Sequence, residues 1–211
     1  MPPRPQRRIN MPKFKELVRM FVAVEIAQKS ALQIEKLMTV FASCGADIKW
    51  VESGQFHVTL KFLGDVERED MADVCMEFQK AVKDIPPFEI QATGAGAFPK
   101  IEMPRTVWVG VEDPSSQLTA AFNAVEAAAV KIGFVRENKP YVPHITLGRI
   151  RKPSAALRDL SEKIAQYPRC DLGKTYVTHI DVLSSELTRR GPLYAVLARC
   201  PLHGIEFKDE D

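Results

Sequence analysis

Apolar side chains along this chain recur with two different periods. Short continuous or alternating runs predict strands, and apolar residues spaced by three or four predict amphipathic helices. The first half predicts, in order, strand 19–26, helix 27–44 ended by Gly45, strand 49–51, turn 52–54, strand 55–63, helix 65–83 capped by Asp65, and strand 88–92. The second half predicts a glycine-rich connection 93–99, strand 106–111, helix 114–132 ended by Gly133, strand 141–150, helix 154–166 capped by Ser154, and strands 176–183 and 193–200 joined by a turn around Arg190-Gly191-Pro192.

The order strand, helix, strand pair, helix, strand therefore occurs about twice. We predict an α+β fold of two pseudo-symmetric lobes, each a mostly antiparallel sheet backed by helices, with a central cleft between them. The halves share little sequence outside one short motif, so the repeat rests mainly on element order. We expect a single bilobal domain at 18–203, preceded by a flexible Pro/Arg-rich extension at 1–17 and followed by an acidic tail at 204–211.

Two stretches of the chain carry the same pattern, His-x-Thr-Leu. They begin at His57 and at His144, about half of the folded chain apart. Residues two apart on a strand share a face, so each stretch places an imidazole beside a hydroxyl and turns its two apolar side chains toward the core. The duplication predicts one site built from two similar half-sites, facing each other across the cleft.

Two imidazoles at one site can carry out general acid and base catalysis together. The unperturbed pKa of histidine is about 6.5, so near neutral pH one of His57 and His144 can act as the base while the other acts as the acid. The hydroxyls of Thr59 and Thr146 can donate hydrogen bonds to anionic oxygens, which suits a phosphate held between the motifs. This chemistry requires no metal ion and no cofactor, and we expect neither.

Other kinds of site fit these residues less well. A zinc site is disfavoured because neither motif has a neighbouring carboxylate or thiol, and a serine nucleophile is disfavoured because the chain has no G-x-S-x-G. A third alternative is that each motif histidine is a buried structural residue without a catalytic role. This explanation suits a single histidine better than a duplicated pair. His179 and His203 have no threonine partner and are expected to be structural or on the surface, with His179 the better placed to face the cleft. The glycine-rich stretch 93–99 lacks the spacing of a phosphate loop.

Bulk composition narrows the class of protein. The net charge of +2 and the isoelectric point near 8.3 are too small a bias to argue for nucleic acid by themselves. Four scattered cysteines without a C-x-x-C pair exclude a zinc ribbon and fit reduced cytoplasmic thiols. No apolar run is long enough to span a membrane, and the first residues lack a secretory apolar segment. We expect a cytoplasmic monomer with no membrane partner.

With these motifs in place, the chain resembles the two-histidine phosphoesterase superfamily, which is defined by two H-x-[ST]-x motifs on opposing strands. Within it, the resemblance is closest to the bacterial and archaeal RNA 2',3'-cyclic phosphodiesterases, also called 2'-5' RNA ligases. The stretches that carry it lie in family order between about residue 18 and residue 202, at 19–25, 57–64, 96–99, 107–111 and 143–149. The departures are the N-terminal extension and Gly148, where the family pattern leads us to expect alanine.

The resemblance implies a metal-free enzyme that opens a 2',3'-cyclic phosphate at an RNA 3' end and leaves a 2'-phosphate. Carried onto this chain, it makes His57 the proton donor to the departing 3' oxygen and His144 the proton acceptor that activates water. Thr59 and Thr146 then hold the non-bridging oxygens. In the reverse direction the acid and base exchange roles, which allows a weak 2'-5' RNA ligase activity.

Three further residues are candidate substrate contacts. The resemblance places Arg149 near the phosphate, but strict alternation from His144 turns it to the other face, so this role needs a strand irregularity. Phe21 or Tyr141 is a candidate to stack on the terminal base, although burial in the core is the competing prediction for Phe21. Two alternatives stay open for the whole protein: a nucleotide- or RNA-binding module without turnover, and a phosphodiesterase of a small cyclic-phosphate nucleotide.

Overall fold

The computed structural model describes residues 16–52, 54–188 and 191–205. In chain order its elements are β1 (Leu17–Glu25), α1 (Gln28–Ala42), β2 (Ile48–Trp50), β3 (His57–Glu67), a short 3-10 helix (Arg68–Asp70), α2 (Met71–Val82), β4 (Phe88–Phe98), β5 (Thr106–Glu112), α3 (Gln117–Lys131), β6 (His144–Ile150), α4 (Ala156–Ala165), β7 (Asp171–Val177), β8 (His179–Leu187) and β9 (Pro192–Pro201).

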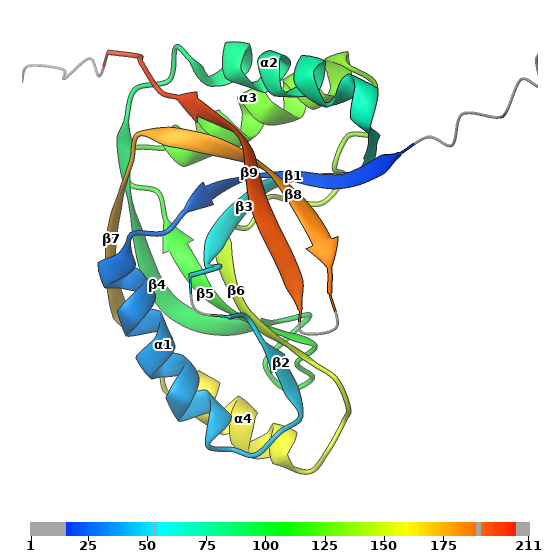
Figure 1. Cartoon of the computed structure of the whole chain (residues 1–211). Helices are drawn as coiled ribbons and strands as arrows, with labels where there is room; N and C mark the ends of the chain where they lie inside the picture. The colour runs from blue at the N-terminus through cyan, green and yellow to red at the C-terminus, as the bar shows by residue number, and fades with distance from the viewer. Residues whose placement is uncertain (1–15, 53, 189–190, 206–211) are drawn as a thin grey trace, which may run out of the picture.

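The strands form one strongly curled antiparallel sheet. Its order is β7-β4-β5-β6-β3-β1-β8-β9, and β2 pairs with β6 beside this path. Helices α2 and α3 cover the half that contains β3, β1, β8 and β9, whereas α1 and α4 cover the half that contains β4, β5, β6 and β7 (Figure 1). We call these halves the first and second lobes. The predicted α+β fold of two lobes is therefore confirmed, with the refinement that their sheets are continuous.

The two lobes join at the centre of the sheet, where β3 lies beside β6. The backbone pair that links these strands is Val58 with Ile145, and both side chains are fully buried. Each is the residue between the histidine and the threonine of its motif. The junction of the lobes is thus also the place where the two motifs meet.

Amphipathic helices close the core behind the sheet. In α1 the residues Ile34, Leu37 and Phe41 recur every three or four positions and are buried, and in α2 Val74, Phe78 and Val82 do the same. A fully buried side chain of this size contributes roughly 1.5–3 kcal/mol relative to exposure. This packing fixes the back of each lobe and leaves the motif face of β3 and β6 free of helices.

The helix predicted at 65–83 begins later than expected. β3 continues to Glu67 and keeps pairing with β1, helped by Gly64, whose φ of 76° allows a turn in the strand that other residues rarely adopt. Asp65 therefore lies inside the strand, where its carboxylate is 3.4 Å from Arg19 Nε. The prediction that Asp65 caps a helix was wrong.

The glycine-rich stretch predicted as a connection at 93–99 is strand up to Phe98, as part of β4, so that prediction was wrong. It pairs with β5, and Gly96 lies opposite Trp108. A Cβ atom on Gly96 would lie 2.3 Å from the Trp108 ring, so only glycine allows the backbone to pass there. Glycines that resembled a loop signal instead make room for a tryptophan.

The C-terminal third also differs from the prediction in two places. Helix α4 begins at Ala156, and Ser154 offers its backbone carbonyl rather than its hydroxyl to the Leu157 N–H at 3.2 Å, so the predicted Ser154 cap was wrong. The single strand predicted at 176–183 is two strands, because β7 pairs with β4 in the second lobe and β8 pairs with β1 in the first. Arg190, in the predicted turn, lies outside the described residues.

No helix in the described ranges is both long enough and apolar enough to cross a membrane.

Candidate active site

The two motifs lie side by side at the centre of the sheet. The pair Val58–Ile145 sets an antiparallel register between β3 and β6. Each histidine therefore lies next to the threonine of the other motif, on the face of the sheet opposite to the Val58 and Ile145 side chains. His57 and Thr59, and likewise His144 and Thr146, are only half-buried, while the residues between and after them are buried. The predicted composite site of two half-sites therefore has the required backbone arrangement.

Both histidines are oriented by the same local device. The Nδ1 atom of His57 lies 2.8 Å from the Gln55 carbonyl, and the Nδ1 atom of His144 lies 2.7 Å from the Val142 carbonyl. A carbonyl oxygen only accepts hydrogen bonds, so in each case Nδ1–H donates and the proton is fixed on that nitrogen. The Nε2 atom of each ring is thereby left available to exchange a proton with a substrate.

Aromatic rings surround each imidazole. His57 packs against Phe21 and Tyr194, with ring centroids 5.1 and 5.4 Å away. His144 packs against Phe98 and Trp108, with centroids 5.0 and 6.3 Å away. These contacts restrict the rotation of both rings and exclude water from their sides.

The pKa of each histidine is lowered from its ordinary value of 6.5. For His57 the largest cause is burial, which disfavours the charged ring; the Gln55 carbonyl opposes this effect, and the nearby His144 adds to it. For His144 burial is again the largest cause, the Val142 carbonyl opposes it, and the positive charge of Arg149 adds to it. The Val58–Ile145 pair places the two histidines on neighbouring strands, so a positive charge on His144 disfavours one on His57.

A cavity of about 540 Å³ opens on this face of the sheet. Its walls include His57, Thr59, Thr146, Arg149 and Phe21. His144 is not part of the cavity wall, and it lies beside the cavity against the aromatic rings of the second lobe. The volume is within the range of small-molecule and nucleotide sites, which is roughly 300–1,000 Å³.

Arg149 reaches the cavity because of a strand irregularity. The β5–β6 register runs from Val107 opposite Gly148 directly to Trp108 opposite Thr146, so Leu147 is an extra residue in β6. Such a bulge resets the alternation of faces, and Thr146 and Arg149 consequently both line the cavity. The irregularity that the predicted position of Arg149 required is therefore present.

The two candidate aromatic contacts have different surroundings. Phe21 is only 2% exposed, yet its ring packs against His57 and Tyr194 and forms part of the cavity wall, so it is both a core and a site residue. Tyr141 is not in the wall: its ring stacks on Phe122 at 4.0 Å, and its hydroxyl donates to the Thr59 carbonyl at 3.4 Å. Tyr141 thus supports the backbone of the first motif from behind.

Several cavity residues were not foreseen from the sequence. Tyr194 comes from β9, Phe62 from the part of β3 beyond the motif, and Lys49 and Trp50 from the short β2. None of them belongs to a motif, and their arrival at the cavity depends on strand pairings between distant segments. Gly148 is the one sequence feature connected with this part of the wall. A Cβ atom there would lie 2.9 Å from Trp50, so glycine allows β2 to pack closely against β6.

Comparison with known proteins identifies the family. The model of the LigT-like phosphoesterases matches residues 24–108 and again residues 109–194, one match for each half of the chain. A protein of Methanothermobacter thermautotrophicus named RNA 2',3'-cyclic phosphodiesterase is 34% identical over 178 residues, which cover 84% of this chain and 95% of that protein. One of the same name from Aquifex aeolicus is 36% identical over 157 residues, covering 74% and 82%.

Solved structures show the same fold. A crystal structure of a Thermus thermophilus protein has a TM-score of 0.73 and 26% identity, covering 89% of this chain and all of that one. The crystal structure of Escherichia coli LigT without ligand has a TM-score of 0.71 and 24% identity, covering 89% and 98%. On the double family match and the identity to the curated relatives, the chain belongs to the LigT-like phosphoesterase family.

Proposed function

We propose that this protein hydrolyses the 2',3'-cyclic phosphate at the 3' end of RNA to a 2'-phosphate. The observation that carries the proposal is the pair of oriented imidazoles, His57 and His144, each beside a threonine hydroxyl where the two lobes meet. Curated relatives that match most of the chain are named RNA 2',3'-cyclic phosphodiesterases. An RNA end or a related nucleotide is therefore the substrate class.

The two histidines divide the proton transfers between them. Neutral His144 takes a proton from water at Nε2 as the water oxygen attacks phosphorus. The bond between phosphorus and the 3' oxygen breaks, and protonated His57 gives its Nε2 proton to that oxygen. One water is consumed and the phosphate stays on the 2' oxygen. At the end of the reaction His144 is protonated and His57 is neutral. The carbonyls that hold Nδ1 keep each Nε2 directed at the reaction.

Charge builds on the non-bridging oxygens of the phosphate during this attack. Thr59 and Thr146 donate hydrogen bonds to these oxygens, and the guanidinium of Arg149, brought into the cavity by the bulge at Leu147, adds positive charge. Donors that are fixed before the reaction stabilise the transition state without having to reorganise. The two hydroxyls fix the orientation of the phosphate, and Arg149 offsets its negative charge.

The terminal base lies against the aromatic wall. Phe21 and Tyr194 pack against His57 and against each other, with their own ring centroids 5.0 Å apart, and Tyr194 is half-buried in the cavity wall. An unstacked base at an RNA end can stack on such rings. Tyr141 holds the Thr59 backbone instead of contacting the base.

Two finer points belong to the same proposal. Joining of a 2'-5' linkage is the reverse reaction and remains weak, because a 5'-hydroxyl RNA end must outcompete water. The working form is a cytoplasmic monomer, which is consistent with four unpaired cysteines, Cys44, Cys75, Cys170 and Cys200.

The experiment compares turnover with binding. Wild-type protein is incubated with a short RNA that ends in a 2',3'-cyclic phosphate, and loss of the cyclic end is followed by chromatography. Opening of the cyclic phosphate supports the proposal. Tight binding without opening would assign the cavity to a binding module, and opening of a small cyclic-phosphate nucleotide in strong preference to RNA would assign it to that substrate.

A further inference from the structure

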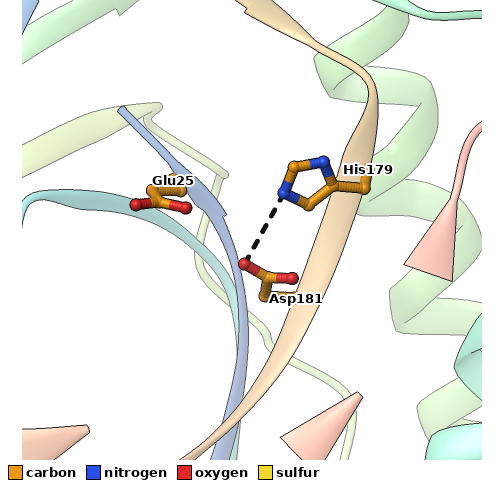
Figure 2. Close-up of side chains that lie close together, drawn as sticks. All are labelled: Glu25, His179 and Asp181. Atoms are coloured by element: carbon orange, nitrogen blue, oxygen red, sulfur yellow. Dashed lines mark ion pairs between the residues drawn. The ribbon is translucent and has the colours of Figure 1, made fainter. Parts of the chain in front are cut away.

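A second group of ionisable side chains lies outside the catalytic cavity. Glu25 at the end of β1 approaches His179 and Asp181 at the start of β8, and one ligand-type atom of each lies within 4.8 Å of the others (Figure 2). The β1–β8 register pairs Ala23 with Asp181, so Glu25 comes next to His179. All three project from the same face of the sheet, because residues two apart on a strand share a face.

The atoms of His179 and Asp181 that face away from the group are already held. Thr178 Oγ1 lies 3.0 Å from Nδ1 of His179, and Arg199 Nε donates to Oδ1 of Asp181 at 3.2 Å. This arrangement directs Nε2 of the imidazole toward Oδ2 of the carboxylate. Outer hydrogen bonds to the far atom of a histidine or carboxylate are typical of side chains that ligate a metal ion.

The two facing atoms are separated by a distance that suits a shared ion. Nε2 of His179 and Oδ2 of Asp181 lie 3.8 Å apart, which is too far for a hydrogen bond. Two ligands at about 2.0–2.2 Å from one zinc ion have roughly this separation. Asp181 is only 2% exposed, and Arg199 holds its Oδ1 atom, which leaves Oδ2 as the carboxylate oxygen that faces His179.

We propose that Glu25, His179 and Asp181 bind one divalent transition-metal ion of the zinc type. Glu25 is exposed at the rim, so it can move to complete the set while solvent fills the remaining position. Two carboxylates outweigh the single positive charge of Arg199, which leaves the group able to accept a cation. The imidazole nitrogen favours zinc and similar ions over calcium or magnesium, which take oxygen ligands.

This metal site is separate from the catalytic residues. None of its three side chains lines the catalytic cavity. Glu25 is nevertheless paired with His57 in the β1–β3 register, so the ion would lie about one strand away from the proposed proton donor. The site does not rest on the proposed phosphodiesterase activity, and its test does not measure that activity.

The test is a zinc titration of protein that has been stripped with EDTA and exchanged into chelator-free buffer. Isothermal titration calorimetry is expected to show one ion per chain for wild type, with affinity at least tenfold lower for His179→Ala and for Asp181→Asn. His203→Ala is the matched control, since this exposed histidine lies outside the group, and it is expected to bind zinc as wild type does. Wild-type affinity in His179→Ala, or no specific binding by wild type, would overturn the proposal.

A second control is needed because His57 and His144, as two neighbouring imidazoles, could also bind zinc. A His57→Ala/His144→Ala protein is expected to retain the high-affinity ion, and its loss there would assign the ion to the cleft instead. Circular dichroism verifies that each variant is folded, and His179→Gln replaces His179→Ala if that variant is not. Zinc is expected to raise the melting temperature of wild type but not of His179→Gln, since an ion that binds only the folded state stabilises it.

Discussion

Val58 pairs with Ile145 at the junction of the two lobes, and this pair brings the two His-x-Thr motifs together. Because the strands are antiparallel, each motif histidine neighbours the threonine of the other motif. The proposed proton donor, His57, and the proposed proton acceptor, His144, therefore come from different lobes, and each has a threonine hydroxyl beside it. The relation between the lobes, rather than either lobe alone, sets the distance between the two imidazoles.

Removal of either imidazole tests the division of roles. His57→Ala and His144→Ala are each expected to lower kcat for cyclic-phosphate opening by about 10²–10⁴-fold, the usual value of one proton transfer. The double variant is expected to lose less than the product of the two effects, since the histidines act as a unit. His203→Ala is the control. Full activity in either single variant would rule out the mechanism.

The pH dependence of kcat/KM follows from the lowered pKa values of both histidines. One histidine must be protonated and the other neutral, so the profile is expected to be bell-shaped. Because burial lowers both pKa values below 6.5, both limbs are expected below that pH for the free enzyme, and activity falls as pH rises through neutrality. Initial rates at low substrate concentration between about pH 4 and pH 9 measure this. An activity maximum on the alkaline side of neutrality would contradict the assignment.

A buried ion pair stabilises the segment that leads into β6. Lys61 Nζ lies 3.0 and 2.8 Å from the two carboxylate oxygens of Glu126, and it also donates to the Val135 carbonyl at 2.8 Å. Lys61→Met leaves the Glu126 carboxylate buried without its cation, and we expect a loss of about 3–5 kcal/mol in the free energy of unfolding. Urea denaturation measures it.

The control for that prediction is the double variant Lys61→Met/Glu126→Gln, which removes both charges. Its loss of stability is expected to be smaller than that of Lys61→Met alone, because no unpaired charge is left in the core. If Lys61→Met changed the free energy of unfolding by less than about 1 kcal/mol, the pair would have no structural role.

Gly148 is expected to be intolerant of a side chain. A Cβ atom there would lie 2.7 Å from the Ile48 side chain and 2.9 Å from the Trp50 ring. Gly148→Ala should therefore displace β2, destabilise the protein by roughly 1–3 kcal/mol and raise KM through the moved wall. Gly191→Ala, whose Cβ would meet Glu52 Oε1 at 3.7 Å and the Lys49 side chain at 4.0 Å, is the matched control. Equal stability of the two variants would show that β2 adapts without cost.

Sequence reasoning found the features that depend on local pattern. The period-two motifs at His57 and His144 located the central strands, and the helical spacing of Ile34 and Phe41 located a helix. It missed features that depend on distant partners. The glycines of β4 resemble a loop in the sequence because the need for them arises from distant residues, Pro168 at Gly94 and Trp108 at Gly96. Asp65 resembles a helix cap because the pairing of its strand with β1 is nonlocal.

In the site, too, residues in local motifs were predictable, whereas residues brought in by distant strand pairing were not. The histidines and threonines were assigned from the repeated motif, and Arg149 from the resemblance together with an expected irregularity. Tyr194 and Trp50 reach the cavity through strands that are brought there by tertiary pairing, which no local pattern encodes. Tyr141, a candidate for base stacking, instead stacks on Phe122 of α3, a contact that depends on where a distant helix packs.

The most direct measurement incubates the protein with a short RNA that ends in a 2',3'-cyclic phosphate, in the presence of EDTA, and identifies the terminal phosphate. The account predicts complete conversion to a 2'-phosphate, because His57 protonates the 3' oxygen and no ligand of the proposed zinc site lines the cavity. A 3'-phosphate product, or turnover that EDTA abolishes and zinc restores, would contradict it.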